Sequence, residues 1–243
     1  MNKSTFSNFS RGFFLTNHSL EIYLIGIGLS LFGILANMLH GSLLGKVLQL
    51  VSFITLFFSF GYQMSVPLLL TFKQQGKPLD FNNVWSIVKR NTKRMILPTI
   101  LFGILFMVLF VGILIGFVAM SHPSGGQEEV TTIKNFTEQL RNWNPLFIIF
   151  GSVFSFFSFT PIYFSIENKG FFASMRRSVS FSFKHLNFIL LLIVILAINY
   201  TVVTLIRIPI QNPLGLLALT VISQYTALII SASTLLFYQS HKT

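Results

Sequence analysis

The sequence predicts an all-α, polytopic integral membrane protein with six transmembrane helices. Of its 243 residues, 53% are hydrophobic and only 9% are charged, whereas about 25% are charged in an ordinary soluble domain. Because the apolar runs are continuous rather than alternating, we expect helices and not barrel strands. Six charge-free stretches each exceed the roughly 20 residues that a helix needs to cross a bilayer. They are residues 22–45, 47–72, 95–127, 142–166, 185–206 and 208–241.

The charge-free stretches place the individual helices. A charge at the centre of a span costs at least about 2.5 kcal/mol, so each long gap between charges indicates one crossing. Residues 1–19 lack the apolar stretch of a cleavable signal peptide, and we expect the first span to act as its own insertion signal. A single membrane domain is expected over 1–243, with spans at about 20–39, 48–71, 96–120, 145–166, 186–206 and 214–237.

The distribution of basic residues predicts the orientation. Six spans put both termini on one side, and if that side is the cytoplasm, 13 of the 17 Lys and Arg residues lie inside. We therefore expect an N-in/C-in topology, in which the net charge of +11 reflects topology and attraction to anionic headgroups. No nucleic-acid partner is expected, because no separate basic domain exists. The Phe-, Ile- and Asn-rich usage suits a bacterium with a low GC content, which favours a bacterial cytoplasmic membrane.

Two inner loops share a pattern. In each, a proline near the end of a span is followed nine residues later by a glycine: Pro67 and Gly76, then Pro161 and Gly170. A basic segment with apolar residues at helical spacing follows, and then a new span. Such segments lie in the membrane interface with their apolar face dipped in. We therefore expect two cytoplasmic interfacial amphipathic helices, within repeat-like units 48–120 and 145–206.

The second loop carries a resemblance to a known family. The segment Gly170–Ser178 reads GFFASMRRS. Together with six spans and two basic inner hairpins, it resembles the bacterial glycerophosphoryl diester phosphodiesterase membrane-domain family and related six-span proteins. The resemblance implies a membrane module. It implies no phosphodiesterase activity, because that family's catalytic domain is a separate soluble unit with no counterpart in these residues.

The basic loop segments are the candidate binding surface. Lys and Arg near the cytoplasmic leaflet attract anionic headgroups by about 1 kcal/mol each, and aromatic residues anchor at the interface. We expect a non-enzymatic membrane accessory or scaffold protein that engages anionic lipid, and that also binds a membrane protein partner or a second copy of itself. The candidate residues are Lys89, Arg90, Lys93, Arg94, Arg176, Arg177 and Lys184, with Trp85 and Phe172.

The inventory of reactive residues predicts neither an enzyme nor a metal site. Cysteine is absent, which excludes thiol catalysis and thiolate ligands. Asp80 is the only aspartate, and the five histidines are scattered without an i, i+4 pair. We expect no catalytic residues, no metal and no cofactor.

Four amides within the expected spans leave two functions open. Such groups usually hydrogen-bond between helices. Alternatively, they line a polar path, which predicts a small transporter or permease subunit for a neutral or amphiphilic solute. The amides are Asn37, Gln63, Asn199 and Gln224. Gly112 and Gly116 form a GxxxG pattern that serves close helix packing within the chain or in a dimer.

Overall fold

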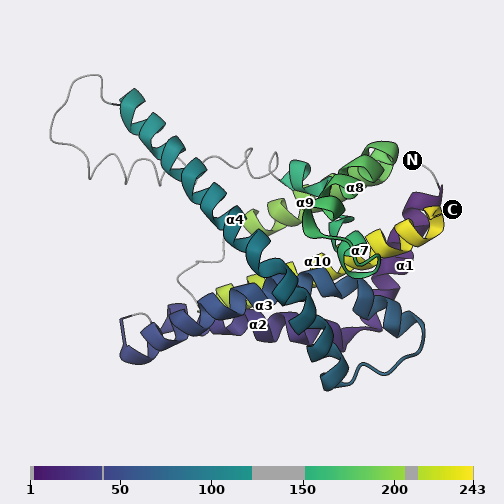
Figure 1. The fold of residues 1–243 in the computed structure, drawn as a ribbon, viewed down its shortest axis with the longest axis horizontal. Coiled ribbons are helices and arrows are strands. Elements are labelled where there is room, and N and C mark those ends of the chain that lie inside the picture. The colour runs from purple at the N-terminus through teal and green to yellow at the C-terminus, as the bar shows by residue number, and fades with distance from the viewer. Residues whose placement is uncertain (1–2, 40, 122–150, 206–212, 243) are drawn as a thin grey trace.

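The computed structural model describes residues 3–39, 41–121, 151–205 and 213–242, and these are helical apart from short connections and contain no strand (Figure 1). The predicted all-α class is confirmed. The helices are α1 (Lys3–Asn17), α2 (Leu20–Met38), α3 (Leu43–Gln74), α4 (Phe81–Ser121), α7 (Thr160–Ser165), α8 (Phe171–Lys184), α9 (Leu186–Leu205) and α10 (Pro213–His241).

Several helices are long and apolar enough to cross a membrane. Among the described residues two qualify alone, Leu43–Gln74 and Leu217–His241. The number rises to four if each of two bent pairs counts as one span: α1 with α2, bent by 74°, and α8 with α9, bent by 102°. The expected spans at 20–39, 48–71, 96–120, 186–206 and 214–237 coincide with α2, α3, α4, α9 and α10. The beginning of the expected span 145–166 lies outside the described residues.

The first hairpin differs from the prediction of a separate interfacial helix. Helix α4 runs without interruption for 41 residues, through Pro98, and its second half projects away from the other described helices (Figure 1). No glycine or proline precedes Pro98 in this helix, so nothing in the sequence ends it at the basic segment. Protein covers only part of the apolar face of that segment, because Val84, Val88 and Met95 are buried whereas Phe81 and Trp85 are 78% and 43% exposed.

The second hairpin has the expected separate helix. Helix α8 ends at His185, where the chain turns by 102° into α9. The face that α8 turns to the protein carries Ser174, Ser178 and Ser182, all fully buried. Residue Ser178 donates to the carbonyl of Phe156 at 2.9 Å and accepts from the amide of Phe159 at 3.1 Å.

The paired glycines of the two loops have different roles. Gly76 adopts a left-handed φ of 68° just after α3, the position where helices commonly end in glycine. Gly170 has φ −63° and is the N-cap of α8. The left-handed residue of the second loop is Asn168, with φ 55°, and asparagine tolerates that conformation better than most residues. The described elements of the repeat-like units also differ, because α4 is uninterrupted in the first unit and a separate α8 precedes α9 in the second.

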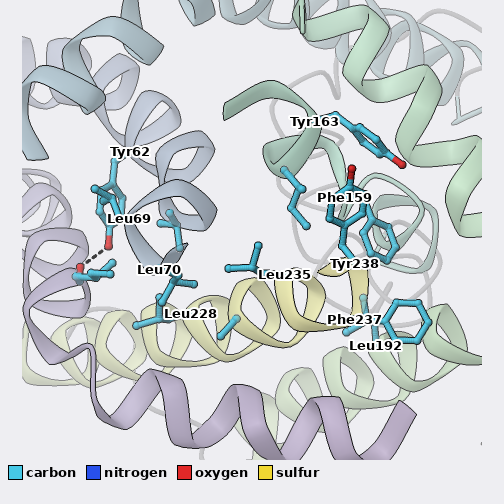
Figure 2. Packing of buried hydrophobic residues seen from close by; sticks show 14 of the residues in the cluster. Tyr62, Leu69, Leu70, Phe159, Tyr163, Leu192, Leu228, Leu235, Phe237 and Tyr238 are labelled. Carbon is cyan, nitrogen blue, oxygen red and sulfur yellow. Dashed lines mark hydrogen bonds between the residues drawn. The ribbon is translucent and has the colours of Figure 1, made fainter. Parts of the chain in front are cut away.

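The buried core is formed by the last parts of α3 and α10, the first parts of α4 and α9, and α7. Figure 2 shows Leu235 of α10 between Leu70 of α3 and Phe159. Away from this core, large apolar side chains such as Phe53, Met107 and Val108 are exposed. Such a surface is stable against hydrocarbon and costly in water, which indicates a membrane environment.

Helix α1 packs antiparallel along the last part of α10 and brings the two ends of the chain together (Figure 1). Asn8 donates to Ser240 at 3.1 Å, and the hydroxyl of Tyr225 donates to Asn17 at 2.6 Å. Between these bonds, a Cβ on Gly12 would lie 2.2 Å from the Ser233 Oγ. Only glycine allows this close approach.

Candidate functional site

The two inner loops and the ends of α1 and α10 meet at one end of the bundle, which we call the basic end. The amide of Gln239 donates to Gln74 at 3.1 Å, and Lys73 forms an ion pair with Glu21. The cations of the basic end are Lys73, Lys77, Lys89, Arg90, Lys93, Arg94, Lys169, Arg176, Arg177, Lys184 and Lys242. Three carboxylates, those of Glu21, Asp80 and Glu167, share this end with them.

One candidate lipid-binding residue, Arg94, is held by the protein itself. Its guanidinium donates to the backbone carbonyls of Phe164, at 3.2 Å, and of Lys169. It also lies 4.0 Å from the centre of the Phe164 ring. The Phe164 carbonyl belongs to the last turn of the short α7 and the Lys169 carbonyl to the loop after it, so Arg94 supplies a donor that the end of the helix lacks. Arg94 is therefore a clamp between α4 and the second hairpin.

Glu167 joins three segments of the basic end. It accepts from Arg177 of α8 at 3.1 Å, from Lys242 at 3.2 Å and from the hydroxyl of Tyr238 in α10. Its side chain is only 15% exposed. Burial alone would raise the pKa of Glu167, but the hydrogen bonds from Tyr238 and Lys242 and the two positive charges together hold that pKa below its ordinary value. The sequence offered no signal for this residue.

Glu167→Gln is expected to lower the free energy of unfolding at pH 7 by about 2 kcal/mol, because two charge-assisted bonds lose their acceptor charge. The unfolded chain binds the proton more readily than the folded chain, so this stabilisation is fully present above the ordinary glutamate pKa of about 4.3. It is lost as pH falls through the lower folded pKa. Unfolding followed by circular dichroism in detergent between pH 7 and pH 3 measures both effects.

The matched control for this prediction is Glu21→Gln, which removes the carboxylate of a more exposed ion pair. A loss of at most about 1 kcal/mol is expected there. Equal losses for the two variants, or a Glu167 effect that persists unchanged at pH 3, would contradict the role of Glu167 as a buried hub.

On α4, three cations lie on an exposed face beside aromatic rings. Lys89, Arg90 and Lys93 are exposed, and among the described residues no carboxylate pairs with them. Trp85 is 43% exposed and stacks on Phe58, with ring centres 5.3 Å apart. The stack fixes the indole at the edge of the cationic face.

Helix α8 presents a second exposed cationic face. Arg176 and Lys184 are exposed and lie outside the three ion pairs of the described chain. Phe172 and Phe183 are 55% and 62% exposed on the same helix. The serine face of α8 holds the helix against the protein, so these side chains point away from it. Arg177, by contrast, pairs with Glu167.

Three of the four amides of the spans make hydrogen bonds between helices. The side chain of Gln63 donates to Gln224 at 3.3 Å, and Gln224 donates to Ser30 at 3.1 Å. These bonds join α3, α10 and α2. Asn199 of α9 accepts from Thr226 of α10 at 3.3 Å. The side chain of Asn37 lies outside the described residues.

Glycines other than the predicted pair make the close helix contacts. Gly112 has no heavy atom within 4 Å of an added Cβ, and the surroundings of Gly116 lie outside the described residues. The close contacts are instead those of Gly12 with α10, and of Gly61 with Thr92 of α4. Each of these glycines contacts a small residue on a helix far away in the sequence. A search for small residues spaced along one helix cannot find such a pair.

Two cavities open at the basic end. The larger, about 320 Å³, lies between α1, the α8–α9 bend and the end of α10. The smaller, about 220 Å³, is lined by Tyr163, Arg177, Ser180, Phe181 and Lys184. Within the described parts of the chain, no group of three His, Asp or Glu residues is placed to hold a metal ion.

Comparisons with known proteins give no match: no family model, no curated protein and no solved structure resembles the chain significantly.

Proposed function

We propose that the protein is a non-enzymatic accessory or scaffold protein of a bacterial cytoplasmic membrane, whose basic end engages anionic lipid headgroups. The proposal includes six spans with both termini in the cytoplasm and, from the sequence resemblance alone, a kinship with stand-alone phosphodiesterase membrane domains. The observation that supports it is that the cations of the basic end have two different roles. Some hold the fold together, and a second set is exposed next to exposed aromatic rings and forms no ion pair within the described residues.

The geometry of the second set supports headgroup binding. Lys89, Arg90 and Lys93 project from α4, while Arg176 and Lys184 project from α8. The beginning of α8 lies beside the middle of α4, where Arg94 donates to the carbonyl of Lys169 and Phe102 contacts Phe171, so the two groups lie on neighbouring helices. At about 1 kcal/mol per cation near an anionic surface, five such residues would enrich acidic lipids strongly around the protein.

The bonding of the amides favours this function over a solute path. Gln63 and Gln224 bond to each other, and Gln224 also bonds to Ser30. A transported solute would have to replace these bonds. Amides that join three helices are typical of structural contacts in membrane bundles, at about 0.6 kcal/mol each.

Tryptophan quenching tests lipid enrichment at the basic end. The chain has two tryptophans, Trp85 and Trp143, so Trp143→Phe leaves a single reporter beside the α4 cations. In vesicles, brominated phosphatidylglycerol is expected to quench Trp85 several-fold more than an equal fraction of brominated phosphatidylcholine. Replacing Lys89, Arg90 and Lys93 with glutamine should remove most of this preference.

Lys46→Gln is the control, because Lys46 is exposed at the beginning of α3, away from the basic end. The quenching of Trp85 in that variant should equal the quenching in the Trp143→Phe protein. Equal quenching by the two lipids in the parent protein, or an undiminished preference in the triple variant, would refute headgroup binding by these cations.

A further inference from the structure

The larger cavity is lined by buried aromatic rings and by polar side chains. Its floor includes Phe188 and Phe237, which are buried and stacked with ring centres 4.1 Å apart. Its polar lining consists of Lys184, His185, Asn187, His241 and Thr5, which come from α8, the bend, α9, α10 and α1. Donor groups from five segments therefore converge on one space.

The charge of the lining favours an anion. Lys184 is exposed and cationic, and the rings of His185 and His241 lie 4.9 Å apart. Among the described residues that line this cavity, none is a carboxylate. Glu167, the acid of the second hairpin, is engaged by Arg177, Lys242 and Tyr238. Positive charge near the cavity is thus left without an internal partner.

The edge of the cavity is apolar. Phe183 is 62% exposed and Leu186 is 45% exposed, and both line the cavity at the bend between α8 and α9. A volume of about 320 Å³ is at the lower end of the range of ligand pockets and suits a headgroup rather than whole acyl chains. A ligand with an anionic head and an apolar tail matches both surfaces.

We propose that this cavity is a specific site for the phosphate group of an anionic phospholipid, whose acyl chains leave past Phe183 and Leu186 into the bilayer. Lys184 would supply the cationic donor, the rings of His185 and His241 would supply N–H donors, and Asn187 and Thr5 would supply neutral polar groups. The inference rests on the proposed function, because it needs the basic end to face lipid. It adds one saturable site to the diffuse enrichment around α4.

His185 makes binding pH-dependent. Burial, followed by the charges of His241 and Lys184, lowers the pKa of His185, so its ring is neutral at pH 7.5 in the empty site. Among the described side chains, the charged and titratable groups that face it are Lys184 on α8 and His241 on α10, and Thr5 of α1 and Asn187 of α9 also line the cavity. A bound phosphodiester favours the protonated ring, and therefore affinity should rise as pH falls from 7.5 to 5.5.

Native mass spectrometry of the delipidated full chain, titrated with phosphatidylglycerol or phosphatidylcholine, tests the site. We expect one tight phosphatidylglycerol, bound at least about tenfold more strongly than phosphatidylcholine and several-fold more strongly at pH 5.5 than at pH 7.5. Lys184→Gln should weaken it about tenfold, and His185→Asn should abolish the pH dependence. Lys46→Gln, a cation away from the basic end and outside the cavity lining, is the control. The thermal midpoint of each variant shows that it is folded.

Three results would overturn the site. They are equal affinity for the two lipids, unchanged affinity in a folded Lys184→Gln variant, or binding of sn-glycerol 3-phosphate with no binding of phosphatidylglycerol, which would assign the cavity to a soluble anion. The test is separable from the proposed function. Loss of the Trp85 quenching preference with an intact tight site would reject only the diffuse enrichment, and the reverse pattern would reject only the cavity.

Discussion

Arg94→Ala is expected to lower the free energy of unfolding by about 3 kcal/mol, the largest effect of any cation at the basic end. The guanidinium donates to the carbonyls of Phe164 and Lys169 and covers the Phe164 ring. Alanine leaves both carbonyls without this donor and removes the clamp between α4 and the second hairpin. Arg94→Lys should recover only part of the loss, because an ammonium cannot reproduce the planar fork.

The neighbouring Lys93 gives a matched control. It is exposed on the same helix and forms none of the ion pairs of the described chain, so Lys93→Ala should change stability by no more than about 0.5 kcal/mol. Chemical unfolding in mixed detergent micelles, followed by far-ultraviolet circular dichroism, measures both variants. Similar losses for the two would mean that Arg94 does not act as a clamp.

Gly61→Ala is expected to destabilise the chain by about 2 kcal/mol through overpacking. An added Cβ would lie 2.0 Å from the Thr92 Oγ1 and 2.7 Å from both the backbone nitrogen and Cα of Thr92. The hydroxyl can rotate away, but the backbone of α4 cannot withdraw without separating the two helices. The loss should appear in the same unfolding measurement.

Gly103→Ala is the control for this substitution. Gly103 lies on an exposed part of α4 with nothing within 4 Å of an added Cβ. Alanine there is expected to leave stability unchanged or to raise it by up to about 1 kcal/mol, because helix interiors favour alanine over glycine. Equal stability of the Gly61→Ala and Gly103→Ala variants would contradict a close contact between α3 and α4 at Gly61.

The positions of the helices could be predicted because they depend on local physics. A run of about 20 apolar residues must form its backbone hydrogen bonds internally, so gaps between charges locate helices directly. The continuity of α4 through Pro98 could not be predicted with the same ease. Proline usually ends a helix, and whether it is tolerated depends on the contacts of the flanking residues.

The roles of the charged residues depended on partners far away in the sequence. Arg94 contacts a carbonyl 70 positions further along the chain, and Tyr238 donates to Glu167 across 71 positions. Sequence spacing gave no reason to separate Arg94 from Lys93, although one holds the fold and the other is exposed. The exposure of Lys89, Arg90 and Lys93 follows from the amphipathic pattern of their segment, which is why these residues could be predicted.

The central proposal is that the basic end lies in the cytoplasm, and cysteine labelling tests it most directly. The chain contains no cysteine, so each introduced cysteine is the only reporter. Asn82 of α4 and Ala173 of α8 are exposed at the basic end, and Gln127 follows the third expected span. In intact cells, a membrane-impermeant maleimide should label Gln127→Cys but should label Asn82→Cys and Ala173→Cys only after permeabilisation. Labelling of either Asn82→Cys or Ala173→Cys in intact cells would contradict the proposed orientation.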